Sequence, residues 1–322
     1  FAQFYLMLPL AMIIICVTFI PLYYKMKVYT AYEFLEKRFD LKTRALTASL
    51  FLIQRGIACG ITIYAPAIIL SSVMQWDLKT TTFIIGIIAI AYTVSGGTKA
   101  VHVTHKHQMI IIFISLFIIF FLLIKYITQD YSLQENLLIA KANGKLEVLD
   151  FKWDLNERYN IWSSMAALFL FLSYFGTDQS QVQRYISGRS IKESRLGLIM
   201  NGIMKVPLQF FILFLGVLVF LFYQNSRAPI FFNDQVKMEL AASELSEEFY
   251  ELDKNYNKLI DDKLLTHANL VQAKRDKNTS ELNRLKEEVY GLHLEEKAIR
   301  ADVKGLIEKL DRGLESNDKD YV

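Results

Sequence analysis

A polar run directly follows an apolar segment near the middle of the chain. The apolar segment is Ile161–Phe175. The run after it extends from Gly176 to Arg184, and its notable residues are a glycine, a threonine, an acid, two glutamines and an arginine: Gly176, Thr177, Asp178, Gln179, Gln183 and Arg184. Such side chains are costly in hydrocarbon and are tolerated only where a helix lines protein or water. The glycine loosens the helix at the same point. This pattern is typical of a pathway for a polar solute through a membrane.

Two cations interrupt other apolar segments. Arg55 and Lys205 each lie about ten residues in from the nearest basic loop, at a depth where a charged side chain is expected to face the protein interior. Arginine binds carboxylates through two hydrogen bonds, so Arg55 is either a contact for an anionic solute or a structural partner of a backbone carbonyl or buried acid. Lys205 is likewise either a solute or gating residue, or half of a structural ion pair with an acid such as Asp178.

Aromatic and glycine pairs mark two further positions. Tyr174 and Phe175 precede Gly176, where they either pack in the core or close a path. Gly96 and Gly97 end another apolar segment and predict a helix break at the cytoplasmic surface. The three histidines that follow have spacings that share no helical face and no cysteine accompanies them, so a cytoplasmic turn is favoured over a metal site.

Six apolar segments precede residue 224, and most have the roughly 20 residues that a helix needs to cross a bilayer. They predict an all-α integral membrane protein with residues 1–224 as its transmembrane core. Lysine and arginine concentrate in the loops after the first, third and fifth segments, which predicts that these loops are cytoplasmic. The basic residues thus indicate the topology of the chain rather than nucleic-acid binding. After six crossings of a cell membrane (inner or plasma membrane), residues 225–322 are expected on its extracytoplasmic side. The segments are Phe4–Leu22, Ala45–Met74, Thr82–Ser95, Met109–Ile127, Ile161–Phe175 and Leu198–Tyr223.

Residues 225–322 are charged, and two apolar stripes at alternating spacings of three and four predict a helical hairpin with coiled-coil character. Lys277–Ser280 supplies the helix stop and cap between the stripes. The favoured interpretation is that one stripe packs on the other; the alternatives are a docking surface for a partner protein or a solvated linker. The first stripe is Leu245, Phe249, Leu252, Tyr256 and Leu259, and the second is Leu282, Leu285, Val289, Leu292, Ile299, Val303, Leu306 and Leu310, interrupted by Glu296.

Three blocks in the order Val28–Phe39, Tyr92–Gln108 and Gly176–Arg184 resemble the sodium:solute symporter family. The resemblance implies two inverted repeats of five helices, with solute at the midplane beside broken helices. The six segments would be core helices two to seven, so the chain looks like a piece of a larger protein. Na⁺ would be the coupling ion, no other cofactor is expected, and the main sodium site would lie mostly outside this piece.

The same resemblance implies roles for single residues. Tyr174 matches an inner-gate tyrosine and Lys205 matches a lysine that contacts sugar in a relative, whereas Phe171 replaces a sugar-contacting asparagine. The closer likeness is to the multivitamin, monocarboxylate and iodide branch, whose anionic substrates Arg55 and Lys205 would suit. His105 stands where the family usually has an acid linked to sodium coupling.

The sequence therefore favours sodium-coupled symport of a small organic solute by alternating access, with the solute, Na⁺ and the lipid bilayer as partners. The alternative is a transporter-like sensor or scaffold that binds solute without moving it. An enzyme is not expected, because the apolar segments contain no paired carboxylates and no nucleophile–base pair.

Overall fold

The computed structural model describes residues 2–28, 30–74, 76–154, 160–186, 188, 190–232 and 234–309. Their regular structure is entirely α-helical, as expected for the predicted fold class. The chain divides into two compact units, one formed by residues 1–87 with 148–214 and the other by residues 88–147 with 215–322. Helices α6 (Leu78–Ile127) and α10 (Ile191–Asn225) contribute residues to both.

The first unit is built around the packing of α2 on α8. Most of the buried core is aliphatic, with two phenylalanines of α8, Phe171 and Phe175, among the buried aromatics. Between helices in a bilayer, close van der Waals packing of such side chains, rather than their removal from water, holds the helices together. The helices of this unit, besides its parts of α6 and α10, are α1 (Ala2–Tyr5), α2 (Leu8–Val17), α3 (Phe19–Met26), α4 (Ala31–Arg38), α5 (Leu41–Met74), α8 (Ile161–Thr177) and α9 (Gln179–Ile186).

Five helical segments in the described residues are long and apolar enough to cross a membrane: Ala2–Met26, Leu41–Ser71, Leu78–Gly96, Val103–Ile127 and Ile191–Asn225. They correspond to five of the six predicted segments. The remaining one, Ile161–Thr177, is apolar but has only 17 residues. A straight helix of that length rises about 26 Å, slightly less than the hydrocarbon thickness of a bilayer.

The predicted helix break at Gly96–Gly97 is wrong, because α6 is helical from Leu78 to Ile127. Two glycines cost about 2 kcal/mol of helix propensity, an amount that the other residues of a 50-residue helix can offset. The two apolar segments on either side, Leu78–Gly96 and Val103–Ile127, are nevertheless distinct.

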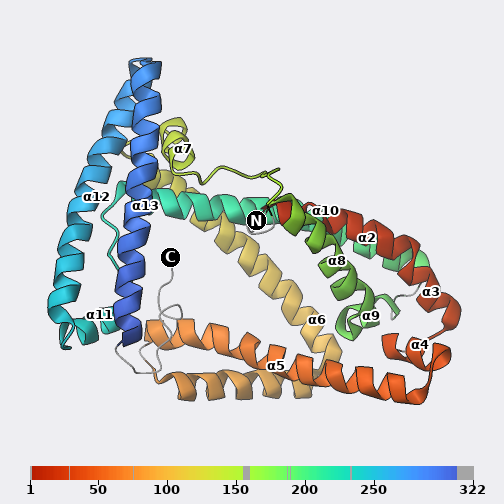
Figure 1. Cartoon of the computed structure of the whole chain (residues 1–322). Helices are drawn as coiled ribbons and strands as arrows, with labels where there is room; N and C mark the ends of the chain where they lie inside the picture. The colour runs from red at the N-terminus through yellow and green to blue at the C-terminus, as the bar shows by residue number, and fades with distance from the viewer. Residues whose placement is uncertain are drawn as a thin grey trace. The chain divides into compact units, whose positions relative to one another are not determined.

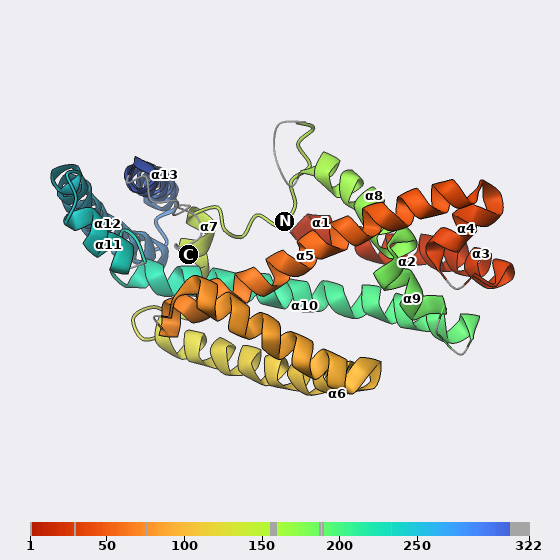
Figure 2. The ribbon, with the colours of Figure 1, turned by 90° about the horizontal axis from the view of Figure 1, so that it is seen from below.

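The second unit contains the predicted hairpin, whose arms are α12 (Ser246–Arg275) and α13 (Thr279–Lys309). The two helices pack on one another. Figure 1 shows them as the two arms of the hairpin, close together at the end where they are joined, and Figure 2 views both nearly end-on. Leu285, Val289, Val303 and Leu306 of the predicted stripe are buried, which confirms its register; Leu310 lies outside the described residues. The unit also holds α7 (Leu133–Ala142), α11 (Asp234–Ala241) and the C-terminal parts of α6 and α10.

A buried ion pair fills the interruption in the apolar stripe. Glu296 accepts a hydrogen bond from the Lys263 ammonium at 2.5 Å, and Arg300 Nε lies 3.2 Å from its other carboxylate oxygen. Burial alone would raise the pKa of Glu296, but His293, Lys263 and Arg300 hold that pKa well below its usual range. Replacing an apolar residue of the stripe with an acid is therefore tolerated because each charge has a hydrogen-bonded partner.

His267 lies one helical turn beyond Lys263 and is 1% exposed. Burial, reinforced by the Lys263 ammonium, lowers the pKa of His267 from 6.5 to about 3. The unfolded chain binds the His267 proton more readily than the folded hairpin does. The hairpin therefore has its full stability above pH 6.5, and its free energy of unfolding falls as the pH drops from 6.5 toward 3.

We expect the hairpin to lose about 2 kcal/mol of local stability between pH 7 and pH 4.5 through this residue. Hydrogen exchange of the α12 amides, corrected for intrinsic rates, measures that loss. The variant His267→Leu should abolish most of the pH dependence in this window, whereas replacing the exposed His107 with leucine should leave it unchanged. An unaltered pH profile in His267→Leu would contradict this assignment.

Candidate functional site

The polar run singled out in the sequence is a break between two helices. Helix α8 ends at Thr177, Asp178 has an extended backbone, and α9 begins at Gln179. The Asp178 carboxylate accepts hydrogen bonds from the Ser180 amide, at 2.8 Å, and from the Ser180 hydroxyl. An aspartate in this position caps the new helix, and its side chain replaces the carbonyl with which the Ser180 amide would pair in a continuous helix.

In a continuous helix the Ser180 amide would pair with the carbonyl of Gly176. At the break this carbonyl accepts its hydrogen bond from another segment instead. The Tyr23 hydroxyl donates a buried hydrogen bond of 2.7 Å to the Gly176 carbonyl oxygen. The side chain of Gln179 in turn accepts a hydrogen bond of 2.7 Å from the Ala31 amide. A Cβ at position 176 would lie 3.2 Å from the Phe19 ring, so glycine permits this close approach. The break is thus fastened to α3 and α4.

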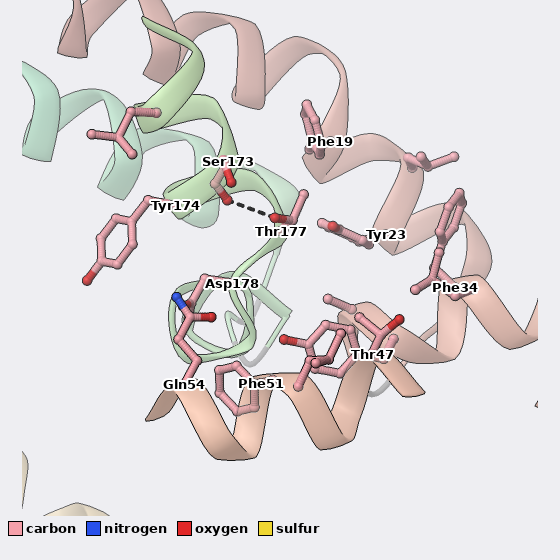
Figure 3. Close-up of a pocket in the computed structure, with 16 residues that line it drawn as sticks. Phe19, Tyr23, Phe34, Thr47, Phe51, Gln54, Ser173, Tyr174, Thr177 and Asp178 are labelled. Carbon is pink, nitrogen blue, oxygen red and sulfur yellow. Dashed lines mark hydrogen bonds between the residues drawn. The ribbon is translucent and has the colours of Figure 1, made fainter. Parts of the chain in front are cut away.

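A cavity of about 480 Å³ lies beside the break, in the first unit (Figure 3). Tyr174, Thr177 and Asp178 of the predicted set reach it, and the Thr177 hydroxyl donates to the Ser173 carbonyl at 2.9 Å. Aromatic rings and a few polar groups share the lining, as in many small-molecule sites. The lining residues are Phe19, Leu22, Tyr23, Ala31, Tyr32, Phe34, Leu35, Thr47, Leu50, Phe51, Gln54, Leu170, Ser173, Tyr174, Thr177 and Asp178.

Tyr174 and Phe175 form an edge-to-face pair with ring centroids 4.9 Å apart. The Tyr174 hydroxyl accepts a hydrogen bond of 2.8 Å from Gln181, which joins α8 to α9 across the break. Phe171 is buried, and its ring centroid lies 5.3 Å from that of Phe4. Tyr174 therefore borders the cavity, whereas Phe171 and Phe175 belong to the core behind it.

Lys205 is held by aromatic rings. Its ammonium lies 5.9 Å from the ring centroid of Tyr5 and 6.0 Å from that of Phe175, within the range of a cation–π interaction. The alternative of an ion pair between Lys205 and Asp178 is wrong in the described part of the chain, because the Asp178 carboxylate caps α9 instead.

The remaining predicted residues are more scattered. Arg55 is exposed on α5, and its neighbour Gln54 reaches the cavity instead. Gln183 accepts a hydrogen bond of 2.7 Å from Gln179. Arg184 lines a second hollow of about 330 Å³ together with Phe175, Gln181, Tyr185, Gly188, Glu193, Ser194, Gly197, Leu198 and Asn201.

Gly96 and Gly97 lie in α6, in the second unit. His105 is exposed on the same helix. In the described residues, no group of three or more histidine, cysteine, aspartate or glutamate side chains is placed to hold a metal ion. The position of the sodium site stays a prediction.

Sequence reasoning missed Tyr23, Tyr5 and Gln181 as parts of this arrangement. Tyr23 and Tyr5 lie in an apolar segment where aromatic residues are ordinary, and their partners are more than 150 residues away in the chain. Gln181 stands inside the conspicuous polar run, so only its pairing with Tyr174 was hidden. A buried tyrosine hydroxyl requires a partner, which is the one general signal that could have drawn attention to Tyr23.

The model of the sodium:solute symporter family matches residues 2–246, which contain the helix break, the cavity and Lys205. The chain belongs to this family. Its members are transporters rather than enzymes and use Na⁺ as the coupling ion. Together with the apolar helices, this membership identifies a multi-pass membrane protein.

Curated relatives match more than half of the chain. The human sodium/iodide cotransporter is 29% identical over 208 residues, which is 64% of this chain and 32% of that protein. The bovine sodium-coupled monocarboxylate transporter 2 is 30% identical over 202 residues, covering 62% of this chain and 32% of the relative. The rabbit sodium-dependent multivitamin transporter is 31% identical over 179 residues, which is 55% of this chain and 28% of that protein. The chain thus spans about a third of the length of the relatives that it matches.

Loss of the Tyr23 hydroxyl should destabilise the helix break. We expect Tyr23→Phe to cost about 1–3 kcal/mol, because the Gly176 carbonyl would stay buried without a donor. Thermal unfolding of the purified protein and hydrogen exchange of residues 176–182 measure this effect. Tyr64→Phe, which alters an exposed tyrosine of α5, is the matched control. Equal stability of the two variants would show that water or another group readily replaces the hydroxyl.

Proposed function

We propose that the complete protein is a symporter that couples the entry of a small organic anion to Na⁺. Family membership over residues 2–246 carries the proposal, and the cavity beside a broken helix supports it. A broken helix offers backbone groups and helix ends to a solute in the middle of a membrane, where an unbroken helix offers none. The absence of covalent chemistry follows from the same family, whose members move solutes rather than convert them.

An anionic solute is favoured by the surroundings of Lys205. Its ammonium faces the rings of Tyr5 and Phe175, and no ion pair of Lys205 with an acid is seen among the described residues. A cation stabilised only by ring faces gains more from an incoming carboxylate than one that already has an acidic partner. The relatives named for iodide and monocarboxylate transport agree with a negatively charged substrate. Phe171, which is apolar and buried, disfavours a sugar.

Alternating access is the mechanism that we propose for this core. The six segments would be core helices two to seven of two inverted repeats, and α8 with α9 would be one of the broken helices. Tyr174 and Phe175 would close the path toward the cytoplasm while solute and Na⁺ bind from outside. The hydrogen bond from Gln181 to Tyr174 would hold this closure, since it spans the two halves of the broken helix.

Three further assignments belong to the proposal. Residues 1–224 would form the transmembrane core, and residues 225–322 an extracytoplasmic hairpin in a cell membrane. Arg55 would contact the solute when the remaining helices of the core surround α5. Gly96, Gly97 and the polar run of α8–α9 would serve as structural motifs of the pathway.

A sensor that binds solute without moving it is the second candidate. The charged hairpin, which forms two helices of about 30 residues each, favours it because a large external module can pass a binding signal to a partner. His105 in place of an acid favours it too, since it removes a group that the family resemblance links to sodium coupling. Sodium-dependent accumulation against a gradient separates the two candidates.

The decisive experiment uses the complete protein in liposomes with an inward Na⁺ gradient and a K⁺ control. Uptake is measured for labelled monocarboxylates, vitamins, iodide and sugars. We expect accumulation of an anionic class that requires Na⁺. Saturable binding without accumulation would instead support the sensor, and sodium-independent uptake would contradict coupling.

Lys205→Ala should raise the Michaelis constant for uptake of the anion at least ten-fold, as expected for the loss of one charge-assisted contact. Lys205→Arg should retain part of the affinity because the charge remains. Lys192→Ala, an exposed lysine of the same helix, is the matched control. Normal kinetics in Lys205→Ala would remove this residue from the solute site.

Arg55→Gln should weaken uptake of an anionic solute more than uptake of a neutral analogue, because only the anion gains from the guanidinium charge. The ratio of the two specificity constants, compared with the wild-type ratio, is the measurement. An equal loss for both solutes would assign Arg55 a structural role.

A further inference from the structure

The hairpin is attached to the rest of the second unit at three separate places, and this distribution suggests a role for it. All three places lie within that unit. They involve the loop helix α7, the C-terminal part of α10 and the segment that leaves α10.

The first attachment joins the hairpin to α7. Arg275, at the end of α12, donates two hydrogen bonds to the Glu135 carboxylate, at 2.7 and 3.3 Å. Its neighbour Lys274 donates to the Gln134 carbonyl at 3.0 Å. Glu135 also completes the capping box of α7 with Ser132, so the same carboxylate begins the helix and fixes it to the hairpin.

The second attachment surrounds Phe220 of α10. The Lys145 ammonium lies 4.8 Å from the centroid of this ring, and the His293 ring of α13 meets it edge to face at 5.8 Å. The third attachment is made by Arg300 of α13. Its guanidinium donates to the carbonyl oxygens of Pro229 and Ile230 at 3.1 and 3.0 Å, just beyond α10.

Helix α7 in turn joins the C-terminal ends of α6 and α10. Asn136 is fully buried, and its side-chain amide lies within 2.8 Å of the Ile127 carbonyl at the end of α6. The side-chain amide of Asn225, at the end of α10, donates a hydrogen bond of 2.7 Å to the side-chain oxygen Oδ1 of Asn136. The rings of Tyr126 and Phe222 meet edge to face next to this junction, with centroids 6.0 Å apart.

We propose that the hairpin acts in cis as a brace. It holds α7 against the C-terminal ends of α6 and α10, so that these two ends and the hairpin move as one body. A module designed to swing toward a partner would have an exposed linker and few fixed contacts, whereas this one has charged and aromatic contacts on both of its arms. The part of the inference that concerns transport depends on the proposed function; the part that concerns rigidity does not.

Hydrogen exchange of the α7 amides in the complete, reconstituted protein tests the rigidity directly. Arg275→Glu should accelerate exchange of residues 133–142 at least ten-fold, and Arg275→Lys should give a smaller change. Arg284→Glu is the matched control, because Arg284 pairs only with Glu281 and Glu288 of its own helix among the described contacts. Exchange in α7 that is unaffected by Arg275→Glu would overturn the brace.

A cross-link tests the common motion. In a background without other cysteines, Tyr126→Cys and Phe222→Cys are joined by a short thiol-specific linker, and uptake is compared before and after the linkage. Uptake within two-fold of the unlinked protein is expected, since the brace allows no relative motion of the two ends. Loss of uptake that cleavage of the linker restores would overturn the proposal. If the wild-type protein moves no solute, the proposed function fails, and the exchange experiment alone decides the brace.

Discussion

The need to satisfy one backbone carbonyl organises the first unit. Where α8 stops, the Ser180 amide pairs with the Asp178 side chain, and the Gly176 carbonyl loses its helical partner. In an apolar environment that oxygen cannot rely on water, so the hydroxyl of Tyr23 supplies the bond. This single contact brings the end of the first apolar helix against the break. The cavity lined by Tyr174, Thr177 and Asp178 exists because the helix is interrupted there and because α3 and α4 are held beside it.

Much of this arrangement could be predicted from residue types alone. The apolar segments, the hairpin register and the polar run at Gly176–Arg184 follow from hydrophobicity and spacing, which act locally along the chain. The continuous helix at Gly96–Gly97 could not be predicted, because glycine lowers helix propensity by only about 1 kcal/mol per residue and does not by itself decide where a helix ends. The partners of Lys205 and Tyr23 depend on segments far apart in sequence, so local sequence could not decide between a solute role for Lys205 and the alternative of an ion pair with an acid such as Asp178.

The second unit solves a similar problem with charges. Its apolar stripe is interrupted by Glu296, and a buried carboxylate without partners would be strongly destabilising. Lys263, Arg300 and His293 surround it, and Arg300 extends the network to the chain that leaves α10. Replacing the pair by apolar side chains would preserve hydrophobic packing but would remove the bonds that fix the direction of the hairpin. The charged residues therefore compensate one another inside the hairpin and also join it to the chain that leaves α10.

Lys263, which is buried, and Lys205, which is half-buried, differ in how far their surroundings compensate the positive charge. Lys263 is 2% exposed and forms a short ion pair with Glu296, so its charge is already compensated inside the hairpin. Lys205 interacts with the faces of Tyr5 and Phe175, which compensate a positive charge only in part. A desolvated anion near Lys205 would complete that compensation, whereas near Lys263 it would have to displace Glu296. The same side chain is thus fully compensated in one unit and only partly compensated in the other, and this difference is the physical reason for proposing that Lys205 contacts the solute.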